Sequence, residues 1–319
     1  MLEVNELTAV YALQGKRIRA VDHVSFSVKE GEVFGIAGES GSGKSTLAHS
    51  ISFLFPPPLR YEGGSVLFNG KDLGSLGREK LRRDVLGSEI SYVPQSSMNS
   101  LNPTKRVRSL ASDIFNAHGE IDSEEIRRRT KERIELLSLP DSVLDMYPVE
   151  LSGGMKQRVV IALSTLMNPE LLIADEPTSA LDVSSQRLVL GELKKLLERG
   201  SFKSMILITH ELTILKNMAQ RMAIMYAGEF VEMGETRRIF EEPVHPYTRA
   251  LMASIIEPGE RVEEKRIRSI PGAPPDLKGD MPYCRFYDRC AFACGECKNK
   301  QELVEVDGRL VRCGYARDI

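Results

Sequence analysis

The segment at residues 33–46 reads Val33-Phe34-Gly35-Ile36-Ala37-Gly38-Glu39-Ser40-Gly41-Ser42-Gly43-Lys44-Ser45-Thr46. It starts as an apolar run, and from Gly38 it fits the pattern G-x-x-x-x-G-K-[ST] of a phosphate-binding loop. Glycines let backbone N–H groups face the β- and γ-phosphates of a nucleotide, and the following helix adds its positive end. We expect Lys44 to contact phosphate oxygens and the Ser45 hydroxyl to bind Mg²⁺. The predicted nucleotide contacts in this loop are Gly38, Ser40, Gly41, Ser42, Gly43, Lys44, Ser45 and Thr46.

A second apolar run, Leu171-Leu172-Ile173-Ala174, ends in two adjacent carboxylates, Asp175 and Glu176. Open parallel sheets bind ligands at the carboxyl ends of their strands, so both side chains should lie beside the phosphates. Asp175 suits an indirect hold on Mg²⁺, and Glu176 is placed to polarise the attacking water as a general base. Together with the phosphate loop, this pair predicts hydrolysis of ATP with Mg²⁺ as cofactor.

The composition excludes several other classes of protein. Lys and Arg number 43 against 45 Asp and Glu, a balance that provides no overall field to attract nucleic acid or an anionic membrane. No apolar run approaches the roughly 18 residues that a membrane span requires. Glu3 and Glu6 stand where a signal peptide would have its apolar core. The sequence therefore predicts a soluble chain that stays where it is made.

The order of sequence patterns predicts an α/β fold with several segments. Residues 2–32 alternate apolar and polar positions, which is typical of a half-buried antiparallel β layer. Strand-like runs later alternate with helical patterns, which indicates a mostly parallel sheet. We predict a first part of the nucleotide-binding core at 1–100, an inserted helical subdomain at 101–150, a second part of the core at 151–235, and a C-terminal extension at 236–319.

Between the loop and the acid pair lies the octapeptide Leu151-Ser152-Gly153-Gly154-Met155-Lys156-Gln157-Arg158. Ser152, Gly153 and Gly154 stand before a helix and would form a second anion-binding helix start. The octapeptide resembles the signature of the ATP-binding cassette (ABC) superfamily. This resemblance implies a P-loop NTPase fold and a head-to-tail dimer. In that dimer, Ser152, Gly153 and Gly154 of one subunit face the γ-phosphate held by the other.

Four further residues match positions of the ABC pattern. Gln95, after the run 90–94, resembles the glutamine that senses Mg²⁺, so Ser45 and Gln95 are the implied Mg²⁺ ligands. His210, after an apolar strand, resembles the switch histidine that contacts the γ-phosphate, and with Glu176 and Gln95 it completes the implied catalytic set. Tyr11 resembles the aromatic residue that stacks on adenine. Asp182 resembles the aspartate at the dimer seam.

Several segments resemble the ATP-binding subunits of dipeptide and oligopeptide importers: Met155 in the signature and the stretches 98–103, 245–251 and 270–277. One departure is Pro94-Gln95-Ser96-Ser97, where that branch more often has Phe-Gln-Asp-Pro. The resemblance implies an ATPase at the cytoplasmic face of the cell membrane that powers peptide import. The implied partners are a second ABC ATPase subunit, identical or different, two transmembrane permease subunits and an extracytoplasmic solute-binding protein, with no nucleic acid.

Two other functions remain open at this point. An oligosaccharide importer is the first, because relatives of this branch carry sugars and other subunits select the solute. The second is a soluble ABC ATPase that acts on nucleic acid or ribosomes. Proteins of that class resemble paired cassettes or contain long coiled-coil inserts, whereas this chain has one cassette and no such heptads.

All five cysteines fall within the last 36 residues. In a reducing compartment, clustered thiols more often hold a metal than form disulfides. The spacing of Cys284, Cys290, Cys297 and Cys313 resembles the [4Fe-4S] site of some members of the importer branch. These four cysteines would supply the four thiolates that such a cluster needs. Zn²⁺ bound by the same four thiolates is an alternative, as are free or disulfide-bonded thiols. Cys294 is the extra cysteine.

Overall fold

The computed structural model describes residues 1–13, 15–95, 100–119, 122–179, 181–255, 270–279 and 281–315. Residues 96–99, which belong to the stretch after Gln95, and Ala180, which follows the acid pair, lie outside the described residues. The chain divides into two compact units. The phosphate-loop unit comprises Met1–Val28, Val33–Lys71 and Thr209–Ile319, and the signature unit comprises Lys29–Glu32 and Asp72–Ile208.

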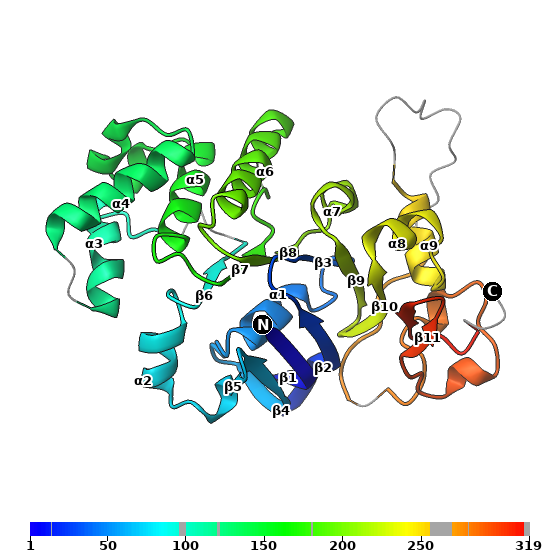
Figure 1. The fold of residues 1–319 in the computed structure, drawn as a ribbon. Coiled ribbons are helices and arrows are strands. Elements are labelled where there is room, and N and C mark those ends of the chain that lie inside the picture. The colour runs from blue at the N-terminus through cyan, green and yellow to red at the C-terminus, as the bar shows by residue number, and fades with distance from the viewer. Residues whose placement is uncertain are drawn as a thin grey trace. The chain divides into compact units, whose positions relative to one another are not determined.

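The N-terminal part of the phosphate-loop unit is an antiparallel sheet with the strand order β2-β1-β4 (Figure 1). Strand β1 (Leu2–Leu13) pairs with β2 (Lys16–Val28) on one side and with β4 (Leu59–Phe68) on the other. Alternate side chains such as Leu2 and Val4 are buried, because successive residues of a strand face opposite sides of the sheet. The predicted N-terminal antiparallel layer is confirmed. A short strand, β5 (Lys71–Asp72), lies where the two units divide.

A second sheet of the phosphate-loop unit carries the phosphate loop. Its strands are β3 (Val33–Ala37), β9 (Arg221–Tyr226), β10 (Glu229–Glu235), β12 (Arg309–Val311) and β11 (Val304–Val306). Strands β3 and β9 are parallel, and β10 and β12 continue the sheet in antiparallel pairings. Phe26 of the N-terminal layer stacks on Phe34 with ring centroids 5.1 Å apart, which packs the two sheets together. Because β11 and β12 come from the C-terminal tail, the tail is built into this sheet.

The α-helices that the structure describes in the phosphate-loop unit are α1 (Lys44–Ile51), α7 (Leu212–Met218), α8 (Thr236–Glu241) and α9 (Pro246–Ala253). Helix α1 starts directly after the phosphate loop, with Gly43 as its N-cap. His245 caps α9, since its ring nitrogen accepts a hydrogen bond from the backbone N–H of Tyr247 at 3.1 Å. Gly43 and His245 therefore mark where α1 and α9 begin.

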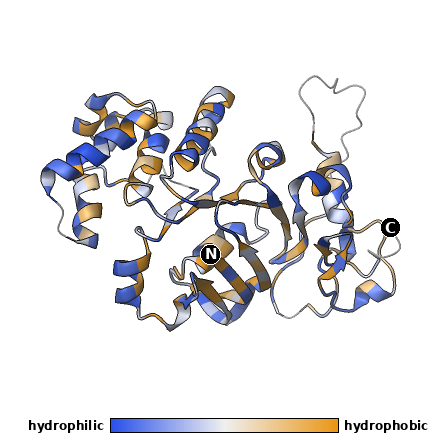
Figure 2. Cartoon of the chain, in the orientation of Figure 1, coloured by the Kyte–Doolittle hydropathy of each residue, from blue (hydrophilic) through white to orange (hydrophobic). Residues whose placement is uncertain are grey.

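The signature unit contains a parallel sheet with the strand order β8-β7-β6. Its strands are β6 (Ile90–Val93), β7 (Leu171–Asp175) and β8 (Ser204–Ile208). Every residue of β7 and β8 is buried, as is typical of parallel strands covered on both faces. In Figure 2 these strands are coloured as hydrophobic over most of their length.

The helices of the signature unit are α2 (Arg78–Lys80), α3 (Val107–His118), α4 (Ser123–Leu136), α5 (Gly153–Ser164) and α6 (Val183–Glu198). Helices α3 and α4 fall within the segment that the sequence predicts to be helical, and they bury Phe115 and Ile134 completely. Among the described residues, no helix is long and apolar enough to cross a membrane.

Candidate nucleotide site

Lys44 occupies the centre of the phosphate loop. Its ammonium group donates hydrogen bonds to the carbonyl oxygens of Gly38 and Glu39, both at 2.9 Å, and only 6% of the residue is exposed. The backbone N–H of Ser42 donates to the carbonyl oxygen of Glu39 at 3.2 Å and closes the turn. The loop is therefore preformed around a positive charge, which suits the binding of phosphate oxygens.

Two glycines of the loop are required for steric reasons. A Cβ atom on Gly38 would lie 2.1 Å from the carbonyl oxygen of Met225, and one on Gly43 would lie 2.2 Å from that of Ala20. Gly43 also has a φ of 106°, a conformation that favours glycine. The glycines thus permit the close approach of β2 and β9 as well as exposing N–H groups to a ligand.

The hydroxyl groups of the loop give a first test of whether nucleotide and Mg²⁺ fit. Ser42 Oγ is buried and, among the residues that the structure describes, has no hydrogen-bond partner. A bound phosphate oxygen would satisfy this hydroxyl. Thr46 Oγ1 lies 3.1 Å from the hydroxyl of Tyr11, which places the end of β1 beside α1. The stacking of Tyr11 on adenine stays a prediction.

The two carboxylates at the end of β7 have different surroundings. Asp175 is completely buried, and its Oδ2 accepts a hydrogen bond from the Tyr92 hydroxyl at 3.2 Å. Glu176 is partly exposed and has a φ of 47°, a left-handed conformation that is uncommon for residues other than glycine. Its backbone N–H is held by the carbonyl oxygen of Ile208 at 2.8 Å. Strained conformations of this kind concentrate at functional sites, where they direct a side chain.

The structure brings Gln95 and Glu176 into contact. Gln95 Nε2 donates to Glu176 Oε2 at 3.0 Å, and the hydroxyl of Ser179 donates to the carbonyl oxygen of Gln95 at 3.2 Å. An amide that holds one carboxylate oxygen leaves the second oxygen able to accept a proton from water. The geometry therefore suits the predicted general base and its neighbouring glutamine.

Ser152 caps the signature helix α5. Its Oγ accepts a hydrogen bond from the backbone N–H of Met155 at 3.3 Å. Ser152 and Gly153 are exposed and Gly154 is partly buried. The first N–H groups of a helix have no intrahelical acceptor, so this exposed helix start can receive an anion. The γ-phosphate contact across a dimer stays a prediction.

Arg158, the last residue of the octapeptide, fixes the position of the signature helix. Its Nη1 donates to the carbonyl oxygens of Leu137 and Ser138, both at 3.2 Å, and lies 3.7 Å from Oε1 of Glu192 in α6. Glu192 is completely buried, and burial raises the pKa of its carboxyl group to about 7. Arg158 thus joins α5 to the end of α4 and to α6.

Asp182 has a structural role within its own unit. It caps α6 by accepting hydrogen bonds from the backbone N–H groups of Ser184 and Ser185, both at 3.0 Å. Hydrogen bonds from the Ser184 and Ser185 side chains hold the pKa of this carboxyl group well below its usual range. The residue is exposed, and its predicted place at a dimer seam remains untested.

The predicted site residues are distributed over both units. The phosphate loop, Tyr11 and the exposed His210 belong to the phosphate-loop unit, whereas Gln95, Asp175 and Glu176 belong to the signature unit. The role of His210 at the γ-phosphate stays a prediction.

Two residues that contact the phosphate loop were missed from the sequence. The hydroxyl of Tyr247 accepts a hydrogen bond from the backbone N–H of Glu39 at 2.9 Å. Arg289 donates to both carboxylate oxygens of Glu39, at 2.7 and 2.9 Å. The sequence contains one signal that could have indicated Arg289. Glu39 is an acidic residue within an anion-binding loop, and such a residue needs a cation nearby.

The [4Fe-4S] site predicted for the tail thiols stays a prediction. All five cysteines are described and free, and among the described residues no group of three or more His, Cys, Asp or Glu side chains is arranged to hold a metal ion. Burial, together with the smaller effect of negative charge on Cys297, Cys313 and Cys290, raises the pKa of Cys284 to about 12. A bound metal would have to displace the proton of this thiol, because metal ligation requires thiolates.

Comparison with known proteins identifies the family. Residues 21–179 match the ABC transporter family, and residues 231–297 match the C-terminal region of oligopeptide/dipeptide transporters. The dipeptide transport ATP-binding protein DppD of Caldanaerobacter subterraneus subsp. tengcongensis is 40% identical over 97% of this chain and 94% of the relative. The chain belongs to the dipeptide and oligopeptide branch of the ABC transporter family.

Two further matches support this family. The oligopeptide transport ATP-binding protein OppD of Bacillus subtilis (strain 168) is 44% identical to this ABC protein over 92% of the chain and 82% of the relative. A dimeric post-hydrolysis structure of the ATP-binding cassette MJ0796 bound to ADP and Pi matches with a TM-score of 0.66. It is 29% identical and covers 74% of this chain and 99% of that one. The predicted cassette fold and ATPase class are confirmed.

We predict that the stability of this ABC ATPase depends on pH through Glu192. Because the folded protein raises the pKa of this carboxyl group to about 7, its neutral form is favoured on folding. Glu192 therefore stabilises the fold fully below the ordinary pKa of glutamate. This contribution is lost as the pH rises through about 7. In thermal unfolding between pH 5 and 8, Glu192→Gln should remove part of the decline seen in the parent protein. Parallel curves for the two proteins would contradict the assignment.

Proposed function

We propose that this chain is the ATP-hydrolysing subunit of an importer of dipeptides or oligopeptides. The observation that carries the proposal is the match of residues 231–297 to the C-terminal region of oligopeptide/dipeptide transporters, since the cassette alone is shared by many transporters. Relatives that match nearly the whole chain are named as dipeptide and oligopeptide transport ATP-binding proteins.

In the proposed reaction, the phosphate loop binds the triphosphate and Glu176 acts on water. Lys44 and the loop N–H groups hold the β- and γ-phosphates, and Glu176 accepts a proton from the attacking water while Gln95 fixes the orientation of its carboxylate. Mg²⁺, when bound, would be held by oxygen atoms of Ser45 and Gln95 and would neutralise charge on the phosphate oxygens. Asp175 would hold the ion indirectly, and His210 would contact the γ-phosphate.

The proposed assembly contains two ATPase subunits. The exposed start of α5 at Ser152, Gly153 and Gly154 would complete the ATP site of a second ABC ATPase subunit, identical or different, with Asp182 at the seam. This chain then lies at the cytoplasmic face of the cell membrane and works with two permease subunits and an extracytoplasmic solute-binding protein.

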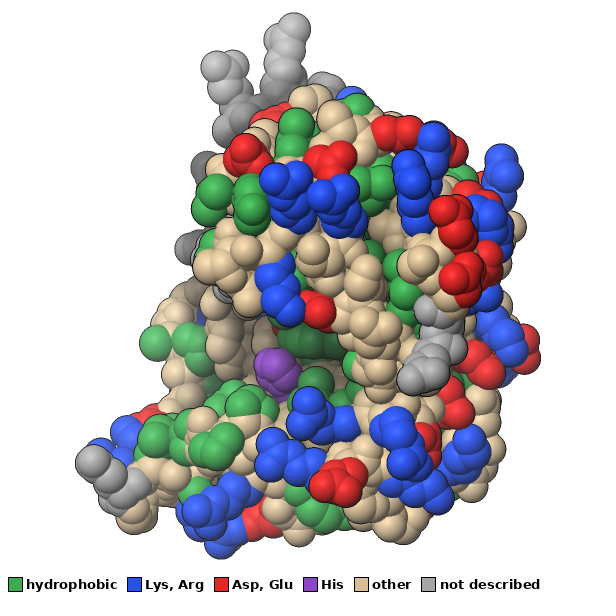
Figure 3. Space-filling view, turned by 90° about the vertical axis from the view of Figure 1, so that its left-hand side faces the viewer, with side chains coloured by type: hydrophobic (Ala, Val, Ile, Leu, Met, Phe, Trp, Pro, Cys, Tyr) green, Lys and Arg blue, Asp and Glu red, His purple; other side chains and the backbone are tan. Residues whose placement is uncertain are grey.

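A pocket in the signature unit supports docking on a permease. It has a volume of about 510 Å³ and is lined by Tyr92 and Pro94, the residue before Gln95 in the sequence, and by residues of α3 and α5. Figure 3 shows a hollow with hydrophobic side chains and a histidine around it. We propose that a permease segment enters this pocket, because movement of Pro94 would reach the Gln95–Glu176 contact directly.

Replacement of the proposed general base gives the central test. Glu176→Gln should bind ATP with nearly unchanged affinity but hydrolyse it at least about a hundredfold more slowly, since the amide keeps the shape and loses the basicity. Phosphate release and ATP binding measured on the same preparation separate the two effects. The variant should also accumulate as an ATP-bound dimer in size-exclusion chromatography. Hydrolysis at the parent rate would remove Glu176 from this role.

Lys44→Ala provides the complementary variant. This substitution removes the positive charge of Lys44 from the centre of the loop, so we expect ATP affinity to fall by about tenfold or more. Isothermal titration with ATP measures this change without dependence on hydrolysis. Unaltered binding by a folded Lys44→Ala variant would show that the loop does not hold the triphosphate.

For the tail we propose a [4Fe-4S] cluster on Cys284, Cys290, Cys297 and Cys313, with Zn²⁺ as the alternative. Its support is the resemblance in spacing and the closeness of two of the cysteines in the fold, since the backbone N–H of Cys284 donates to the carbonyl oxygen of Cys297 at 2.9 Å. The thiol positions described above would have to shift to take a metal.

Metal analysis of protein purified without oxygen tests this proposal. We expect brown protein with about four irons per chain. Cys290→Ser should lose the iron, whereas Cys294→Ser, at the extra cysteine, should keep it. Colourless protein with stoichiometric zinc would establish the alternative, and colourless protein without metal would exclude both.

A further inference from the structure

Glu39 is an unusual residue at its position, because it places a carboxylate within a loop that binds a polyanion. Two like charges at short range repel each other, and they do so more strongly near a protein surface than in bulk water. An uncompensated Glu39 would therefore weaken the binding of ATP. The loop needs either a different orientation of this side chain or a nearby cation.

Arg289 supplies that cation from a position 250 residues away in the sequence. Its two terminal nitrogens bind the two oxygens of Glu39 at 2.7 and 2.9 Å, the bidentate geometry that gives strong and oriented pairs. Only 5% of the arginine side chain and 26% of the glutamate side chain are exposed, so solvent screens this pair less than a surface ion pair.

The guanidinium group of Arg289 is held in place independently of Glu39. Its Nε donates to the carbonyl oxygen of Pro271 at 2.8 Å, and its Nη1 donates to the hydroxyl of Tyr226 at 3.2 Å. The same group lies over the ring of Tyr226, 5.6 Å from the centroid, where a cation–π interaction adds to the attraction. The arginine is therefore preorganised to receive the glutamate.

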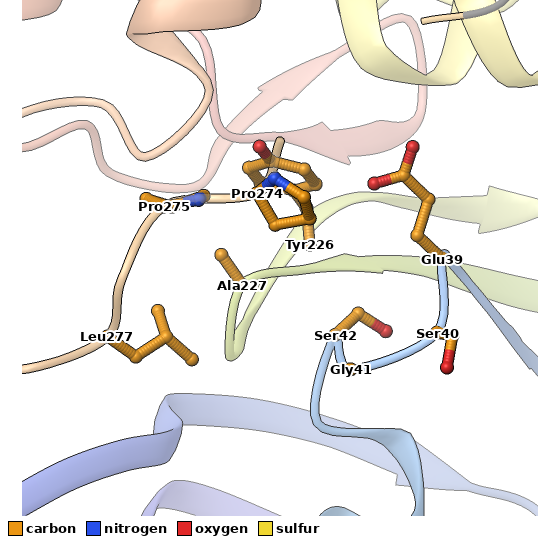
Figure 4. A pocket seen from close by; sticks show the side chains of 9 residues that line it. All are labelled: Glu39, Ser40, Gly41, Ser42, Tyr226, Ala227, Pro274, Pro275 and Leu277. Atoms are coloured by element: carbon orange, nitrogen blue, oxygen red, sulfur yellow. The ribbon is translucent and has the colours of Figure 1, made fainter. Parts of the chain in front are cut away.

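The tail touches the phosphate loop at two further points. Tyr247 accepts the hydrogen bond from the Glu39 backbone N–H, and its ring packs on Phe286 of the cysteine segment with centroids 5.4 Å apart. Pro274 and Pro275 face the loop across a cavity of about 20 Å³, enough for about one water molecule, which Figure 4 shows from close by. Residues of the tail therefore lie against the phosphate loop.

We propose that Arg289 is a positioning residue of the ATP site: it neutralises Glu39 and holds the phosphate loop in the conformation that binds the triphosphate. The cysteine-bearing tail is then a working part of the nucleotide site. This inference rests on the proposed ATPase function and assigns to that site a residue from outside the cassette motifs.

A double-mutant cycle on this pair tests the inference. Arg289→Met leaves the carboxylate of Glu39 uncompensated, so ATP affinity, measured by titration at low salt, should fall by about tenfold or more. Adding Glu39→Gln removes that charge and should restore the affinity to within about threefold of the parent protein. A merely structural role of Arg289 predicts no such rescue, because the second replacement cannot restore lost packing.

A matched control is available in the same tail. Arg309 is also a buried arginine of the tail, and its Nη1 lies 3.6 Å from the carboxylate of Glu232, away from the loop. Arg309→Met should lower the thermal stability without changing ATP affinity. If Arg289→Met does not fold, Arg289→Gln serves in the same cycle, because its amide removes the positive charge while keeping N–H donors for the carbonyl oxygen of Pro271.

The possible outcomes separate this inference from the proposed function. Parent protein that fails to bind ATP would overturn the proposed function. Parent protein that binds ATP, together with a folded Arg289→Met variant of equal affinity, would overturn the role of Arg289 alone. A double variant as weak as Arg289→Met would also overturn it, since the carboxylate of Glu39 would then not be the cause.

Discussion

The phosphate loop is enclosed so tightly by backbone carbonyl groups that the surrounding strands depend on its two inner glycines. The carbonyl oxygens of Met225 and Ala20 would lie 2.1 and 2.2 Å from any Cβ atom on Gly38 and Gly43. Strands β2, β3 and β9 can converge on the loop only because those positions lack side chains. The same closeness keeps the N-terminal layer, the phosphate loop and the following helix in one compact unit, which gives Lys44 its fixed place.

Much of the fold could be predicted from local patterns. The apolar runs at 33–37 and 171–174 lie in strands β3 and β7, and Ser152, which the sequence places before a helix, is the N-cap of α5. These elements follow from burial on both faces of a strand or from a helical cap, which nearby residues determine. The short strands β11 and β12 were not predicted, because β12 pairs with β10, more than seventy residues away in the sequence, and β11 pairs only with β12.

In the candidate site, too, local sequence patterns predict the residues but not the contacts between distant ones. Motif spacing was sufficient to select Gln95 and Glu176, but not to predict that their side chains meet at 3.0 Å or that Glu176 has a left-handed backbone. The contact of Arg289 with Glu39 joins residues that no motif connects, so only the folded chain reveals it. For the thiols, spacing predicts a metal, whereas among the described residues no three His, Cys, Asp or Glu side chains are arranged to hold one.

The pairing of β12 with β10 has a further consequence for the solubility of the molecule. Without the tail, β10 would become an open sheet edge with unpaired backbone groups, the kind of surface on which other chains add and aggregate. Glu232 of β10, completely buried, would also lose Arg309 and remain as an uncompensated charge. The outermost strand is instead β11, only three residues long, which is too short to recruit a neighbouring molecule readily. The tail therefore covers a sheet edge that would otherwise promote aggregation, as well as extending the sheet.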